Sequence, residues 1–245
     1  MIVLGIDTAT SATAVALRLP DGSVVEARDD PPAGAHPGHA TRLLGMAAEL
    51  LDRHALAAPD LNRIAVGSGP GAFTGLRVGI ATARGLAQSL SVELVPVPSL
   101  TALARTAPSS APVLAVIDAR RGEVFAAAFA ADGGPELVPP VVLAPAGIGS
   151  LLEEPGLASV DGARVLGVGD GALRYRAELA AVGIEVPPDD APEHLLRASA
   201  ICELGLAAEP APDYQLVVPD YLRRPDAELT LEAAGATAAG AGGAR

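Results

Sequence analysis

The sequence predicts an α/β protein made of two related halves, each a mixed sheet flanked by helices. Apolar runs at residues 1–7 and 113–118 both end in aspartate, Asp7 and Asp118, and both lead through a turn into a second apolar run. In the first half, three strand patterns precede helix, strand, helix and strand, unlike the strict alternation of a dinucleotide-binding sheet. This duplicated order matches the plan of actin-like, sugar-kinase and Hsp70-like (ribonuclease H-like) proteins.

The first half begins with a predicted antiparallel meander. Its strands are residues 1–7, 13–20 and 23–28, and Pro20-Asp21-Gly22 supplies the turn between the second and third. A helix is predicted from His39 to His54, because Leu43 and Leu50 recur on one face together with other apolar residues. A strand at 64–69, a helix from Thr74 to Ser89, a strand at 92–98 and a short helix at 99–106 complete this half.

The second half repeats the theme less clearly. Strands are predicted at 113–118 and 123–130, a strand, glycine turn and helix at 165–175, and a helix at 195–208. The predicted domain boundaries are therefore 1–106 and 107–225, with the segment 216–225 packing back on the body. Residues 226–245 are predicted to form a disordered tail, because the last dozen residues are almost only Ala, Gly and Thr.

Composition excludes several function classes. The formal net charge is −12, so nucleic-acid binding by this chain alone is not expected. All 17 basic residues are arginine, which excludes Schiff-base catalysis and the lysine of a Walker A loop. The single cysteine, Cys202, lies in an apolar run and is expected to be buried and inert. The chain has no signal-peptide pattern and no apolar run of membrane length, so a cytoplasmic protein without a membrane anchor is expected.

A glycine loop, "GSGPG" at residues 67–71, leads into the helix that starts near Thr74. Backbone N–H groups of Gly69 and Gly71, with the positive end of the helix, suit an oxyanion. A tight strand-to-helix turn without a ligand explains the same pattern equally well. A nucleophile elbow is excluded, because glycine flanks Ser68 directly on both sides.

The helix after this loop carries a ridge of small residues at every fourth position, namely Gly75, Gly79, Ala83 and Ala87. Three glycines in one helix cost about 1 kcal/mol each relative to alanine, so close approach of another element is expected. That element is either a helix of a partner subunit or the chain's own sheet. We favour the partner, with Leu43 and Leu50 of the helix at 39–54 sharing the interface.

The remaining candidates are polar residues near strand ends. Asp7 and Thr8 stand where related ATP-binding folds contact phosphate and magnesium, although a structural role is favoured because the usual glycine is missing. His36 and His39 lack a third ligand nearby, so a loop or interface contact is preferred to a metal site. The pairs Arg120-Arg121 and Arg223-Arg224 predict either solvated turns or an electrostatic seam with a partner.

Four segments resemble the TsaB (YeaZ) family. "GSGPGAFTGLRVGIATARGLA" is similar to its Gly-Pro-Gly-Ser-Phe-Thr-Gly-[Leu/Val]-Arg hallmark, "MIVLGIDTAT" to its opening, "IDARRGEVF" to its Asp-Ala-Arg-x-x-Glu-Val-Tyr segment and "PDYLR" to its Pro-x-Tyr-Leu-Arg close. The segments occur in the family's order and extend over residues 1 to about 225. Ala72 and Phe125 depart from the usual Ser and Tyr, which leaves the resemblance intact.

The resemblance implies a non-catalytic partner in making threonylcarbamoyladenosine beside the anticodon of tRNAs that read codons starting with A. It implies docking on the paralogue TsaD, association with the ATPase TsaE through that complex, homodimers when alone, and indirect contact with tRNA. The two metal-binding histidines of TsaD would fall at Ser99 and Leu103, so neither a metal nor a cofactor is expected. Asp7, Thr8, Gly69, Gly71 and Asp118 would then be remnants of a nucleotide site.

Two other functions are weighed against the scaffold. The first is a stand-alone ATPase or small-molecule kinase, in which Asp7 and Asp118 hold magnesium and the glycine loop holds the phosphates. The second is a peptidase, which ranks last because the sequence offers neither a nucleophile–base pair nor a metal cluster.

Overall fold

The computed structural model describes residues 1–32, 34–158 and 164–222. The predicted disordered tail at 226–245 and the pair Arg223-Arg224 lie outside the described residues.

The first sheet has five strands in the order β3-β2-β1-β4-β5. Its members are β1 (Val3–Asp7), β2 (Thr13–Arg18), β3 (Val24–Asp29), β4 (Arg63–Gly69) and β5 (Glu93–Pro98). β1, β2 and β3 pair antiparallel, whereas β4 is parallel to β1 and β5 is parallel to β4. The predicted turn between β2 and β3 is confirmed, with Gly22 at a φ of 90° that a glycine adopts without strain.

The second sheet repeats this plan in the order β8-β7-β6-β9. Its strands are β6 (Val113–Arg120), β7 (Glu123–Phe129), β8 (Glu136–Leu143) and β9 (Leu166–Val168). β6, β7 and β8 form an antiparallel meander and β9 is parallel to β6. Glu185 bridges Leu166 in parallel, at the place that β5 has in the first half. The duplicated actin-like fold class predicted from the sequence is confirmed.

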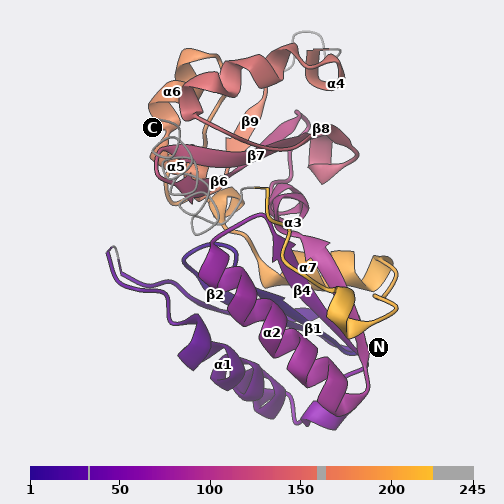
Figure 1. The fold of residues 1–245 in the computed structure, drawn as a ribbon. Helices are drawn as coiled ribbons and strands as arrows, with labels where there is room; N and C mark the ends of the chain where they lie inside the picture. Colours follow the sequence, from indigo (N-terminus) through magenta and orange to yellow (C-terminus); the bar gives the residue numbers. More distant parts are fainter. Residues whose placement is uncertain (33, 159–163, 223–245) are drawn as a thin grey trace, which may run out of the picture.

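Helices form the layers around the two sheets (Figure 1). α1 (His39–Arg53) and α2 (Phe73–Leu90) lie side by side on the outer face of the first sheet. α3 (Ser99–Arg105) and α7 (Ala198–Ala207) lie between the sheets and share one apolar core with both. The outer face of the second sheet is covered by α4 (Pro155–Ala158), α5 (Asp170–Arg174), α6 (Arg176–Ala181) and the 3-10 helix Pro145–Glu153.

α7 belongs to the first half in space, although it follows the second half in sequence. Gly5 of β1 faces it so closely that a Cβ there would lie 2.6 Å from Cys202 Sγ. The side chain of Glu26 accepts the Ala198 N–H at 2.8 Å, and Arg63 donates to the Gly205 carbonyl at 2.7 Å. An acid at the helix N-terminus and a base at its C-terminus both complement the helix dipole.

The chain after α7 also returns to the first sheet, as Figure 1 shows for the yellow segment. The Ala211 N–H donates to Leu94 O at 2.8 Å, and the Asp220 N–H donates to Ser68 O at 2.7 Å. Residues 198–222 belong by sequence to the predicted unit 107–225, but in the structure they pack on the half that was assigned to 1–106. Within the described residues, none of the helices has the length and apolar character that crossing a bilayer requires.

Candidate functional site

Asp7 lies at the carboxyl end of β1, where the ligand sites of open α/β sheets are found. Its side chain is 2 % exposed. Oδ1 accepts the Ala9 N–H at 2.8 Å, and Oδ2 accepts the Ser99 hydroxyl at 3.1 Å. Burial raises the pKa of Asp7 to about 6, and the two hydrogen bonds together with the charge of Arg28 only partly offset that effect. Both carboxylate oxygens thus already have partners from the chain itself.

Ser99 links this carboxylate to the glycine loop. Its hydroxyl donates to Asp7 and accepts the Gly69 N–H at 3.3 Å. Gly67 is required beside this pair, because a Cβ there would overlap Asp7 Oδ2. Leu103, one helical turn on, is 1 % exposed in the core between the sheets. The two positions at which the resemblance places the metal ligands of TsaD therefore hold a hydrogen-bonding serine and a packed leucine.

The turn after β1 also fills the space in front of the glycine loop and α2. The Ala72 N–H donates to Ala9 O at 2.7 Å, and Thr8 Oγ1 donates to Gly75 O at 2.8 Å. A Cβ at Gly71 would collide with Ala9, and a Cβ at Gly75 or Gly79 would collide with Thr8. The glycines are thus explained by close packing against the chain's own backbone, without a ligand.

This packing corrects the predicted partner surface. All six residues assigned to it are buried within the chain, namely Leu43, Leu50, Gly75, Gly79, Ala83 and Ala87. The small-residue ridge serves the approach of α2 to the Thr8 turn and the first sheet, which is the alternative that sequence reasoning ranked second. Small residues signal a close approach, and they do not reveal which element approaches.

Asp118 at the end of β6 repeats the geometry of Asp7. Its Oδ1 accepts the N–H two residues on, from Arg120 at 2.9 Å, as Asp7 does from Ala9. Its Oδ2 forms ion pairs with Arg174 at 2.9 Å and Arg120 at 3.3 Å. The Asp118 N–H donates to Asp170, whose pKa is raised by burial. Asp7 and Asp118 were the carboxylates expected to hold magnesium if the chain were an ATPase. In the structure each one accepts a hydrogen bond from the turn that follows its own strand.

His39 is a functional candidate whose setting the sequence did not indicate. It is 4 % exposed at the start of α1, and Nδ1 lies 2.8 Å from Thr13 Oγ1. Nε2 has no hydrogen-bond partner among the described residues and faces Gly75. Burial lowers the pKa of His39, which favours the neutral imidazole. His36 is exposed, and spacing alone could not distinguish the two. The described residues contain no group of three His, Cys, Asp or Glu arranged for a metal ion.

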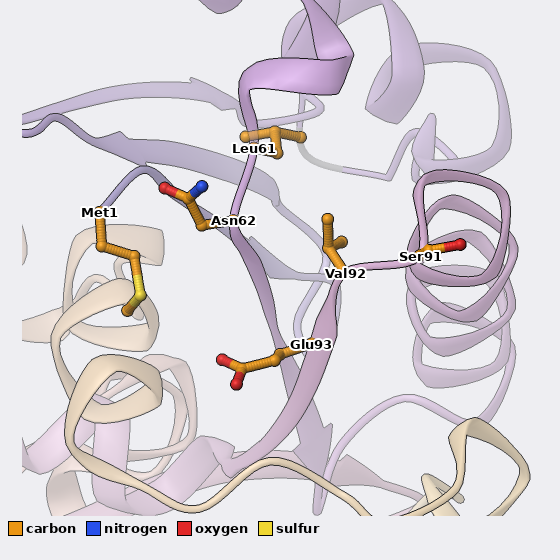
Figure 2. Close-up of a pocket in the computed structure, with 6 residues that line it drawn as sticks. All are labelled: Met1, Leu61, Asn62, Ser91, Val92 and Glu93. Carbon is orange, nitrogen blue, oxygen red and sulfur yellow. The ribbon is translucent and has the colours of Figure 1, made fainter.

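A pocket of about 520 Å³ lies at the end of the first sheet where β1, β4 and β5 begin (Figure 2). Its lining comes from residues just before or at the starts of β1, β4 and β5: Met1, Leu61, Asn62, Ser91, Val92 and Glu93. Asn62 Oδ1 accepts the Ile2 N–H at 2.7 Å, and Glu93 pairs with Arg63 at 2.7 Å. Asn62 and Glu93 thus already have partners within the chain, and the pocket lies at the amino end of β1, whereas Asp7 lies at its carboxyl end.

The surface that remains open on α1 and α2 is their outer face. Leu44 is 55 % exposed there, and a Cβ added at Gly45 or Gly85 would meet open space. Ala48 and Ala81 are also exposed. We call these five residues the outer face of α1 and α2. An exposed leucine among small residues suits contact with another protein rather than a chemical reaction.

Comparison with known proteins places this geometry in a family. Residues 31–159, more than half of the chain, match the family model described as tRNA N6-adenosine threonylcarbamoyltransferase, TsaD. The tRNA threonylcarbamoyladenosine biosynthesis protein TsaB of Bacillus subtilis is 30% identical over 232 residues, 93% of this chain and 96% of that protein. The Escherichia coli protein of the same name is 39% identical over 135 residues, which are 54% of this chain and 56% of that protein.

Solved structures agree with the sequence relatives. YeaZ from Pseudomonas aeruginosa superposes with a TM-score of 0.71 and 28% identity, covering 90% of this chain and 99% of that one. The relative from Bacillus subtilis spans nearly the full length of both sequences, and the structural match includes both halves of the fold. The chain belongs to the TsaB (YeaZ) family.

Proposed function

We propose that this chain is a non-catalytic scaffold subunit that docks on TsaD and activates it. The complex would install threonylcarbamoyl on the adenosine beside the anticodon of tRNAs that read codons starting with A. Family membership supports the pathway, because the Bacillus subtilis relative, which matches over nearly its full length, is named for threonylcarbamoyladenosine biosynthesis. The match of residues 31–159 to the TsaD family model supports a chain that is paralogous to its partner.

One observation carries the non-catalytic part of the proposal. The site where this fold holds phosphate and metal is filled by the chain's own groups: Ser99 on Asp7, Ala9 on the loop before α2, and Thr8 on Gly75. A nucleotide phosphate would have to displace several buried hydrogen bonds. Each bond left unmade in the interior costs about 1–3 kcal/mol, so nucleotide binding there is disfavoured.

Docking would use the outer face of α1 and α2. Leu44 supplies an apolar contact, and Gly45, Ala48, Ala81 and Gly85 let a partner helix approach the backbone closely. The same face would serve a homodimer when TsaD is absent. TsaE would join through TsaD, and the net charge of −12 assigns most contact with tRNA to the partners.

Reconstitution tests the function. Unmodified tRNA is incubated with ATP, threonine, bicarbonate, the threonylcarbamoyl-adenylate synthase, TsaD and TsaE, with and without this chain. Modified adenosine is then quantified by mass spectrometry of the digested tRNA. Product that requires this chain supports the proposal, whereas equal product without it rejects the proposal.

Two variants locate the docking surface in the same assay. Leu44→Arg places a charge on the outer face and should abolish co-purification with TsaD and product formation. Val182→Arg is the control, because Val182 is an exposed apolar residue of the second half. The competing ATPase or kinase would instead show tight ATP binding by the isolated chain that Asp7→Ala removes.

A further inference from the structure

α2 carries positive charge and no negative charge, although the protein as a whole is acidic. Phe73–Leu90 contains two arginines, Arg77 and Arg84, and no aspartate or glutamate. The two lie seven positions apart, which is two helical turns and places them on one side of the helix. Arg77 is exposed and Arg84 is half-buried. Neither forms an ion pair in the described part of the chain, although the formal net charge is −12.

Arg77 is held in place by two aromatic rings. Phe73 and Tyr221 stack with their centroids 5.3 Å apart and their planes at 29°. The Arg77 guanidinium lies 3.9 Å from the Phe73 centroid, and its Nε donates to the Tyr221 hydroxyl at 2.8 Å. Tyr221 is itself fixed, because the preceding residue, Asp220, donates its N–H to Ser68 O. The guanidinium is therefore ordered before any partner binds, which lowers the entropy cost of binding.

The same rings are exposed to an unusual degree for this chain. The sequence has only three Phe and three Tyr, yet Phe73 is 40 % exposed and Tyr221 is 38 % exposed. Large exposed apolar side chains beside an arginine have the composition of binding hot spots. Because Arg77 Nε is engaged, its two terminal nitrogens remain for a ligand, and they match the two oxygens of a carboxylate.

We propose that Phe73, Arg77, Arg84 and Tyr221, together the α2 anchor, bind an acidic protein segment of the docking partner. A carboxylate of that segment faces the arginines, and a neighbouring apolar side chain covers the two rings. The inference rests on the proposed docking on TsaD and adds the chemistry that the partner surface must have. A symmetric contact between the α2 anchors of two copies would instead set arginine against arginine, so a homodimer would use the five residues of the outer face and leave the anchor without an acidic partner. An RNA strand, which stacked rings and arginine also suit, would face the acidic remainder of the chain.

The affinity for TsaD, measured by calorimetry at several salt concentrations, tests the anchor. The Arg77→Gln/Arg84→Gln variant should bind about 10-fold or more weakly at low salt, and its affinity should depend less on salt than that of the wild type. Tyr221→Phe keeps the ring and loses the hydroxyl that orients Arg77, so the affinity for TsaD should fall about 3-fold. Arg164→Gln is the matched control, because Arg164 is an 82 % exposed arginine of the second half.

The outcomes separate this inference from the docking proposal itself. Wild-type affinity and salt dependence in the double arginine variant, with thermal melting unchanged, overturn the anchor and leave docking intact. Failure of the wild-type chain to bind TsaD rejects the docking proposal and the anchor with it. Unchanged TsaD binding with loss of binding to labelled tRNA, or loss of self-association alone in sedimentation, assigns the anchor to another occupant and overturns it.

Discussion

Replacing Asp7 with asparagine should make the protein more stable at neutral pH. The buried carboxyl has a pKa raised from 3.8 to about 6, which at 1.36 kcal/mol per unit is a cost of about 3 kcal/mol once the group is ionised. Asparagine keeps an oxygen that accepts the Ala9 N–H and carries no charge. The side chains are nearly isosteric, so packing beside Gly67 is preserved.

The sign of the pH dependence follows from the raised pKa. Below pH 3.8 the carboxyl is protonated in both the folded and unfolded states and costs nothing. As the pH rises through about 6, the folded state must hold the buried charge, and the cost reaches its full value. The stability of Asp7→Asn relative to the wild type should therefore rise by roughly 2 kcal/mol between pH 4 and pH 7.

Urea unfolding at half-unit steps from pH 4 to pH 7.5 measures this difference. Any constant cost from reorienting the Ser99 hydroxyl cancels, because only the change with pH is interpreted. Asp21→Asn is the control: hydrogen bonds from Ser23 lower the pKa of that exposed carboxyl, so the stability of this variant relative to the wild type should not rise over the same pH range. A stability difference for Asp7→Asn that stays flat over this pH range would refute the assignment of a raised pKa to Asp7.

Three further predictions concern the buried contacts. Gly79→Ala should destabilise the fold by about 1–3 kcal/mol, because the new Cβ meets Thr8. Gly85→Ala, on the open side of the same helix, should stabilise the fold by about 1 kcal/mol. Thermal or urea unfolding compares the two variants, and equal effects would contradict the packing of α2 against Thr8. Ser99→Ala removes a donor to a buried carboxylate, so a loss of about 1–3 kcal/mol is expected at pH 7 and a smaller loss at pH 5; a loss independent of pH would disagree. Burial raises the pKa of the Cys202 thiol to about 12, so a thiol-exchange reagent at pH 8 should react slowly with the folded protein and promptly with the protein unfolded in urea. Rapid reaction with the folded protein as well would show that Cys202 is accessible.

Apolar patterning predicted most of the fold, because the central strands are continuous buried runs and α1 and α2 each bury one apolar face. β8 was not predicted, since Pro139 and Pro140 interrupt its pattern. An edge strand tolerates proline where its N–H groups are not needed for pairing, and β8 is an edge strand. The location of α7 was also out of reach, because its partners on Gly5, Glu26 and Arg63 are more than a hundred residues away in sequence.

The site was predictable in its residues and less so in its contacts. Asp7 and the glycine loop stood out in the sequence as either a phosphate site or a structural turn, and in the structure they pack against the chain's own backbone. Whether Gly79 faces a partner or Thr8 depends on the conformation of the turn after β1, which no local pattern encodes. The anchor residue Tyr221 lies 144 positions from Arg77, so the pair becomes visible only in three dimensions.

The return of α7 to the first sheet has a consequence for synthesis of the protein on the ribosome. The inner face of that sheet, with Val3, Ala65 and Val95, is complete once β5 has been made. The short helix α3 follows at once, but the main cover, α7, begins about 100 residues later at Ala198. At usual translation rates of about 5–20 residues per second, the nascent sheet waits about 5–20 s with an apolar face open to the cell. This arrangement therefore requires that a chaperone or the emerging second half cover the apolar face of the sheet during that interval.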